Sequence, residues 1–282
     1  MIAEELLTQE VGRLLTILYN KRFAALGKLN LGRLLNKNPY LYRALGFSDS
    51  SEFMMQLMVA FISSSDETIF GNDFLEPLAV FAARHANEHG EIQRTVTVGA
   101  GAGQDIAIET ATSYLAISVK SGKNIFNSQS TKGQSAEFTA LTSRLKKLNK
   151  SIRPIIGYGY GRKLQRKASQ DEKLAGQSFW GMLTGELDFY LRLSAAMESF
   201  AGEHGASYKT AFELKHQQLL REFMIGYVDE AGHILWCKVV AFNSAAVKPA
   251  PDKTTISVKK PKASNVLKSD QATSVYAGAK NK

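Results

Sequence analysis

The stretch Gln104-Asp-Ile-Ala-Ile-Glu-Thr-Ala-Thr-Ser-Tyr-Leu-Ala-Ile-Ser-Val-Lys120 is the centre of the fold that this 282-residue sequence predicts. Both ends of the stretch alternate apolar and polar side chains, as half-buried strands do. The four residues Thr110–Ser113 between them suit a tight turn. The sequence therefore predicts a β-hairpin whose turn is centred between Ala111 and Thr112.

The predicted turn determines which side chains lie opposite one another in the hairpin. It places Asp105 opposite Ser118, with Lys120 one diagonal step away on the same face of the sheet. The apolar side chains of the other face are Ile106, Ile108, Leu115, Ile117 and Val119. A carboxylate and an ammonium group therefore converge on one face of a sheet whose other face is apolar.

Two interpretations of this pair are open from the spacing alone. In the first, the hairpin lies at the surface and its polar face simply meets water. In the second, the pair is a site for phosphodiester hydrolysis. Asp105 then holds a hard divalent cation, while Lys120 positions the attacking water and offsets charge on the phosphoryl group.

Composition limits the class of protein. With 44% hydrophobic and 22% charged residues, the chain is expected to be globular, either as one large domain or as one domain with appendages. It contains no apolar run of about 18 residues, the length that a transmembrane helix needs. The acidic start Met1–Leu7 is not typical of a signal peptide, so a cytoplasmic protein is expected. Cys237 is the only cysteine, which excludes an internal disulfide and a cysteine-rich zinc site.

The formal net charge of +9 is concentrated near the C-terminal end of the sequence. Residues 245–282 contain eight lysines against Asp252 and Asp270, together with proline, serine and scattered single hydrophobic residues. This composition predicts a disordered basic tail. The charge by itself does not indicate a nucleic-acid partner.

Periodicity and capping signals predict the elements before the hairpin. Helices are expected over residues 2–26, 49–62 and 67–89, and a strand over Ile92–Val98. A loop over Ser63–Glu67 should separate the second helix from the third, with Glu67 as the acid of a capping box. The glycine run Gly99–Gly103 is expected to be a flexible connection. It is not a phosphate-binding loop, because a strand follows it and no Gly-Lys-Ser/Thr ending is present.

The elements expected after the hairpin are a helix over residues 134–150, a strand over Pro154–Tyr158, helices over residues 171–203 and 207–224, and a late hairpin of Phe223–Val228 with His233–Phe242. This order predicts an α/β fold. Its centre is a mixed β-sheet flanked by helices, with added N- and C-terminal helical segments.

Several blocks of the sequence resemble the type II restriction endonucleases of the PmeII-like kind, within the PD-(D/E)XK nuclease superfamily. The blocks that carry the resemblance are Lys37–Arg43, Ser63–Gly71, Ile117–Gly122, Phe179–Trp180 and Asp188–Tyr190. The resemblance implies a restriction-endonuclease-like core over residues 63–165, preceded by a helical segment over residues 1–62. Residues 166–244 would complete the same domain, before the tail at 245–282.

The resemblance also implies an activity. The chain would be a Mg²⁺-dependent endonuclease that cuts double-stranded DNA at a short specific sequence, with a methyltransferase as its protective partner. Asp105 would be the metal-binding aspartate and Lys120 the catalytic lysine. The alternatives are a repair or junction nuclease with the same core, and a DNA-binding relic that has lost its metal site.

The sequence departs from the family pattern at one position. An acid is expected two residues before the catalytic lysine, and Ser118, a poor ligand for a hard cation, stands there. The resemblance implies that the following helix supplies the missing acid, and Glu137 is the only acid in that helix. Glu137 could equally be a solvated first-turn residue that the helix dipole favours. The run Gly71–Glu76 resembles the helix before the sheet in such nucleases and points to Glu76, ahead of Glu67, as a further ligand.

A basic cluster follows the predicted strand Pro154–Tyr158. It consists of Arg162, Lys163, Arg166 and Lys167, with Tyr158 and Tyr160 nearby. These side chains suit contacts with DNA phosphates or base edges, although a solvated loop has the same composition. His85 and His89 have a spacing that could bind zinc, but a pair of histidines without an identified third ligand is weak evidence for a zinc site.

A homodimer is expected on DNA. A palindromic site presents one scissile phosphate on each strand, and the chain offers a single Asp105/Lys120 hairpin. The apolar faces of residues 2–26 and 171–224 could supply the dimer surface. Alternatively, these helices pack on their own sheet.

Overall fold

The computed structural model describes residues 1–86, 94–101, 103–121, 128–162 and 171–246, and Met1–Ala245 forms one compact unit. Its helices are α1 (Glu4–Gly27), α2 (Leu31–Leu35), α3 (Pro39–Ala44), α4 (Ser50–Phe70), the π-helix η1 (Gly71–Leu75), α5 (Glu76–His85), α6 (Ser128–Leu145), the 3-10 helix η2 (Lys146–Leu148), α7 (Gln177–Thr184), α8 (Phe189–Tyr227) and α9 (Trp236–Ser244). Its strands are β1 (Thr95–Gly101), β2 (Gln104–Glu109), β3 (Ser113–Lys120), β4 (Ser151–Tyr158) and β5 (Glu172–Ala175).

The strands form a mixed sheet in the order β1-β2-β3-β4-β5. The first three are antiparallel neighbours, while β3, β4 and β5 run parallel. The predicted hairpin register is confirmed, because Ile106 pairs with Ile117 and Glu109 with Tyr114. The predicted turn is confirmed as well, since the Thr110 amide donates to the Ser113 carbonyl at 2.9 Å.

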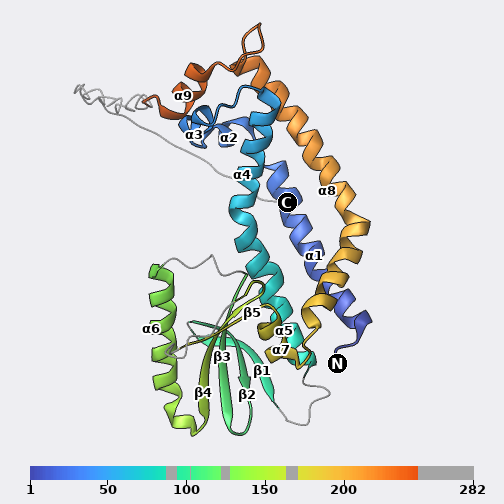
Figure 1. Cartoon of the computed structure of the whole chain (residues 1–282), viewed down its shortest axis with the longest axis vertical. Coiled ribbons are helices and arrows are strands. Elements are labelled where there is room, and N and C mark those ends of the chain that lie inside the picture. The colour runs from blue at the N-terminus through green and yellow to red at the C-terminus, as the bar shows by residue number, and fades with distance from the viewer. Residues whose placement is uncertain (87–93, 102, 122–127, 163–170, 247–282) are drawn as a thin grey trace, which may run out of the picture. The chain divides into compact units, whose positions relative to one another are not determined.

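Helices cover both faces of this sheet (Figure 1). The residues buried against α5 and α7 include Ile106, Ile108, Ile117, Val119 and Ile155. On the other face, Phe138 and Leu141 of α6 pack with Ala116, Ile156 and Tyr158. The hairpin is therefore central to the domain, and its polar face does not simply meet water. The α/β fold predicted from the sequence is confirmed.

Helices α4, η1 and α5 form one continuous helical segment. It begins in a hydrophobic core made of helices alone and ends in the core beside the sheet. The Asp49 carboxylate caps its start by accepting from the Glu52 amide at 2.7 Å, as the sequence predicts. The loop expected over Ser63–Glu67 is wrong, because α4 runs to Phe70 and continues as η1 and α5. The polar run contains no glycine or proline, and Ile62 and Phe70 at its two ends pack into different hydrophobic cores. Tertiary packing therefore keeps a locally weak segment helical.

The flexible connection expected at the glycine run before the hairpin is wrong, because Gly99 and Gly101 belong to β1 and Gly103 directly precedes β2. A Cβ atom on Gly99 would lie 1.9 Å from the Gln104 carbonyl oxygen, so no side chain fits there. Gly103 has a φ of 83°, which only glycine adopts readily. The glycines thus allow two backbones to approach directly before Asp105.

The C-terminal third also differs from the prediction. Residues 171–203 contain β5, α7 and the start of α8, and α8 then continues without a break for 39 residues. The late hairpin is wrong, since Phe223–Tyr227 ends α8, α9 follows, and only a single bridge joins Val228 to Ile234. Phe223 and Val239 face a helical core instead of a sheet.

That second core lies where α2, α3 and α9 meet the ends of α4 and α8 (Figure 1). The long helix α1 packs along α8, and its predicted apolar stripe is buried inside the chain. No helix among the described residues combines the length and apolar character that a membrane span requires.

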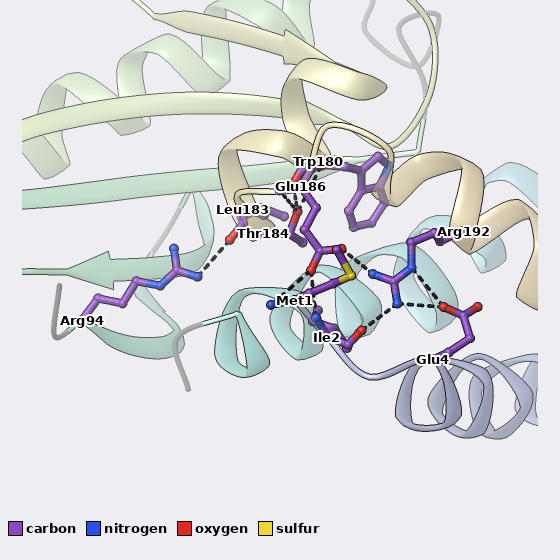
Figure 2. Close-up of polar contacts among 9 residues, drawn as sticks. All are labelled: Met1, Ile2, Glu4, Arg94, Trp180, Leu183, Thr184, Glu186 and Arg192. Carbon is purple, nitrogen blue, oxygen red and sulfur yellow. Dashed lines mark hydrogen bonds and ion pairs between the residues drawn. The ribbon is translucent and has the colours of Figure 1, made fainter. Parts of the chain in front are cut away.

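An ionic clamp ties the start of the chain to α8 (Figure 2). The Arg192 guanidinium donates to the Glu4 carboxylate at 2.7 Å and to the Ile2 carbonyl at 2.6 Å, and it pairs with Glu186. Glu186 in turn accepts from the Ile2 amide at 2.8 Å. A second arginine, Arg94, donates to the Leu183 carbonyl at 2.9 Å and so ties the start of β1 to α7.

Candidate active site

The topology brings Asp105 and Lys120 to the same edge of the sheet. Lys120 is the last residue of β3, and the carboxyl ends of the parallel strands β3, β4 and β5 meet there. Asp105 reaches the same edge because β2 is antiparallel to β3 and begins there. The Lys120 Nζ lies 3.8 Å from the Asp105 Oδ2, with about a quarter of each side chain exposed (27% and 26%).

The hairpin itself orients the Asp105 carboxylate. Its Oδ2 accepts from the Val119 amide at 2.6 Å and from the Ser118 hydroxyl at 3.3 Å. Among the described residues, none donates a hydrogen bond to the other oxygen, Oδ1. One oxygen is thus fixed by donors of the chain, which leaves the second available to a cation.

Glu76 supplies a second carboxylate from the helical side of the site. It is half-buried at the junction of η1 and α5. Burial raises the pKa of Glu76, the Asp105 charge raises it further, and Lys120 partly lowers it. A π turn inserts an extra residue into a helix and changes the direction of the side chains that follow, and such turns are frequent at functional sites. Two mutually repelling carboxylates near an ammonium group suit a bound divalent cation.

The third side of the site is α6, which offers Gln134 and Glu137. The Ser118 hydroxyl donates to the Gln134 Oε1 at 3.0 Å, and the Gln134 Nε2 donates to the Gly103 carbonyl at 2.7 Å. Glu137 lies one turn further along α6, is exposed, and packs against Gly103. The α6 side chain in contact with Ser118 is therefore the amide of Gln134, and not the carboxylate that the resemblance implies for this helix.

Glu67 lies beside this edge of the sheet and does not have the capping role that the sequence predicts for it. Since α4 runs through the polar segment, Glu67 has no helix start to cap. Its carboxylate instead accepts from the Ser121 hydroxyl at 3.1 Å and from the Tyr160 hydroxyl at 3.2 Å. Burial and the charge of Glu67 raise the pKa of Tyr160. Ser121 directly follows Lys120, so Glu67 braces the end of β3.

A cavity of about 830 Å³ opens beside this edge. Its walls include Phe70, Leu75, Tyr160, Arg162, Trp180 and Tyr190. The cavity adjoins the candidate site. Gly159 lines the cavity, and its amide donates to the Lys120 carbonyl at 2.8 Å. Arg162 is exposed, which leaves its guanidinium accessible to a ligand outside the domain.

Other candidate residues of the sequence lie elsewhere or outside the described residues. Glu109 pairs with Lys150 at 2.6 Å, and His85 Nδ1 lies 3.0 Å from the Phe81 carbonyl. The basic residues Lys163, Arg166 and Lys167, together with His89 and residues 247–282, are not among those that the structure describes. Within the described ranges, no group of three His, Cys, Asp or Glu side chains is placed to hold a metal ion. A cation at this edge would therefore depend on two carboxylates and on neutral oxygens.

This combination of an α/β sheet and an Asp–Lys pair at the carboxyl edge of its parallel strands is the arrangement that the sequence predicts for a nuclease. Comparison with known families agrees with that class. The family model of the type II restriction endonuclease EcoO109I matches residues 5–205, more than half of the chain, and the chain belongs to that family. No curated protein matches the chain. The protein is thus a nuclease of the type II restriction class, which generally uses divalent metal ions and acts on DNA.

Proposed function

We propose that the protein is a Mg²⁺-dependent endonuclease that hydrolyses both strands of double-stranded DNA at a short specific sequence. We further propose that it belongs to the PD-(D/E)XK superfamily and is of the PmeII-like kind. The observation that carries the proposal is the 3.8 Å approach of Lys120 to Asp105 at the carboxyl edge of the sheet. The family match over residues 5–205 supports the same class of activity.

The residues at this edge fit a magnesium ion. Oxygen ligands are what Mg²⁺ prefers, and it commonly binds through one or two carboxylates, with waters and substrate phosphates completing its shell. Asp105 and Glu76 supply the carboxylates, and α6 adds a neutral oxygen beside Ser118 together with the negative charge of the exposed Glu137. When bound, the ion supplies Lewis-acid polarisation of the phosphate and lowers the pKa of a bound water.

Lys120 performs the remaining chemistry of the chain. Its ammonium group is held beside Asp105, so it can donate to a water that attacks the phosphorus atom or to a phosphoryl oxygen. Negative charge grows on the phosphoryl oxygens as the water adds to phosphorus, and it passes to the leaving oxygen as that bond breaks. A fixed ammonium group favours that state over the ground state, and this difference accelerates hydrolysis.

Contacts with DNA outside the reacting phosphate come from the basic residues that follow β4. Arg162 is exposed there, and the sequence adds Lys163, Arg166 and Lys167, which lie outside the described residues. Arginine and lysine bind phosphates, which positions the protein on the duplex without reading its sequence.

The active species on DNA is a homodimer. Each chain offers one Asp105/Lys120 edge, so double-strand cleavage at a palindrome uses two copies. Although α1 and α8 pack on each other, α8 keeps Leu191, Leu214 and Ile225 exposed, and these suit a surface between copies. A separate methyltransferase would protect the host DNA.

Digestion of several plasmids of known sequence tests the function. Discrete fragments that require Mg²⁺ support a site-specific enzyme. Random fragments or cleavage confined to branched DNA would indicate the repair or junction nuclease instead. DNA binding without any metal-dependent nicking would indicate a relic that has lost its metal site, and would contradict the proposal.

A further inference from the structure

Gln134 is a buried polar side chain at the candidate site. An apolar side chain would fill the same space without burying an amide group, so packing alone does not explain it. Its Nε2 donates to the Gly103 carbonyl, so its Oε1 must face the Ser118 hydroxyl. The orientation of this amide is therefore determined by its neighbours on both sides.

The Ser118 hydroxyl connects this amide to the metal-binding aspartate. It has one hydrogen and two acceptors within reach, the Gln134 Oε1 at 3.0 Å and the Asp105 Oδ2 at 3.3 Å. Gln134 thus approaches the hairpin at the position that lies two residues before Lys120. Glu137 is exposed on the next turn and lies against Gly103 instead.

We propose that the Ser118–Gln134 pair takes the place of a metal-binding carboxylate, with the Gln134 Oε1 as the ligand oxygen that α6 contributes. This inference rests on the proposed function and specifies how its metal is held. Asp105 and Glu76 then provide the negative charge, Gln134 provides a neutral oxygen, and Glu137 adds charge only from the rim.

Charge has a predictable effect at such a site. Carboxamide oxygens do bind hard cations, but ligand charge sets much of the affinity. With Gln134 in place of a third carboxylate, the site carries one negative charge fewer. It should therefore bind Mg²⁺ weakly without DNA and more tightly when the substrate phosphate joins it. The substitution Gln134→Glu adds the missing charge. In the absence of metal, the same substitution places a carboxylate against the Gly103 carbonyl and near Asp105, which destabilises the fold.

Two measurements on the full chain without DNA test the assignment. The first is calorimetric titration with Mg²⁺, and the second is thermal unfolding with and without Mg²⁺. Gln134→Glu should lower the Kd for Mg²⁺ at least about tenfold. It should also show a lower melting temperature without metal and a larger rise on adding metal than the native chain. Glu109→Gln is the control and should leave the Kd nearly unchanged, because Glu109 pairs with Lys150 away from this edge.

Ser118→Asp is a second route to the same result, since it restores the carboxylate from the hairpin. It should also tighten Mg²⁺ binding, and it decides the matter if Gln134→Glu does not fold. Unchanged Mg²⁺ affinity in the variants that fold would overturn the assignment, as would loss of Mg²⁺ binding in Glu137→Gln alone. Failure of the native chain to cut DNA would instead refute the proposed function, so the two failures are distinguishable.

Discussion

The two carboxylates of the candidate site are held in opposite ways. On the hairpin side, one oxygen of Asp105 receives the Val119 amide at 2.6 Å and the Ser118 hydroxyl, with Lys120 close by. On the helical side, no described residue donates a hydrogen bond to Glu76, and burial raises its pKa. The comparison indicates that the hairpin fixes the orientation of the Asp105 carboxylate before a cation binds. The helix instead provides a half-buried negative charge on Glu76, which a bound cation would neutralise.

The largest effect should come from the hairpin side. Asp105→Ala and Lys120→Ala should each reduce the cleavage rate by at least about 10²–10³-fold, since each removes a group that acts directly on the reacting phosphate. DNA binding at the specific site should persist, because its contacts come from elsewhere. Cleavage rates and gel-shift affinities measured with Mg²⁺ provide the check.

Glu109→Gln is the control for these two variants. Glu109 belongs to the same hairpin but pairs with Lys150 away from the site. It should cut DNA at nearly the native rate. An Asp105→Ala or Lys120→Ala protein with near-native activity would place the active site elsewhere.

Glu76→Gln should have the next largest effect, a loss of cleavage of about 10–100-fold. The amide removes the repulsion from Asp105 and leaves less charge half-buried, so the metal-free protein should unfold at the same or a higher temperature. The stabilisation by added Mg²⁺ should shrink at the same time. A variant that loses stability without metal would show that Glu76 is structural, contrary to the comparison above.

Glu137→Gln should have a smaller effect on cleavage, within about tenfold, yet larger than that of Glu109→Gln. Glu137 is exposed, so water screens most of its attraction for a bound cation. Cleavage rates at several Mg²⁺ concentrations should show the deficit chiefly where Mg²⁺ is scarce. A complete loss of activity would make Glu137 a direct ligand.

Arg192→Ala should leave cleavage unchanged while it destabilises the protein. The arginine holds the start of the chain to α8 through Glu4, Glu186 and the Ile2 carbonyl, and it is largely buried. Its loss leaves a buried carboxylate partly unpaired, at a cost of about 3 kcal/mol in the free energy of unfolding. The exposed pair Arg13–Glu10 is the control, and Arg13→Ala should cost less than about 1 kcal/mol. Denaturant titrations of both variants would measure the difference.

The sequence was informative where the determinants of structure are local. Alternation and a four-residue turn predict the β2–β3 register, and with it the approach of Lys120 to Asp105. The continuity of α4 could not be read in the same way, because a polar run such as Ser63–Glu67 is helical only through packing at its ends. The sequence does not single out Gln134, because a neutral amide is not a typical ligand of this motif, and only the tertiary structure places it beside Ser118.

The most direct test of the central claim is a time course on supercoiled plasmid DNA of known sequence, with the native chain and Asp105→Ala in parallel. Each protein is incubated with Mg²⁺ and, separately, with a chelator. The native chain with Mg²⁺ should give discrete fragments whose mapped ends share one short sequence, and the other three reactions should leave the plasmid intact. Equal cleavage by Asp105→Ala, or cleavage by the native chain in the presence of chelator, would contradict a metal-dependent site at the Asp105–Lys120 edge.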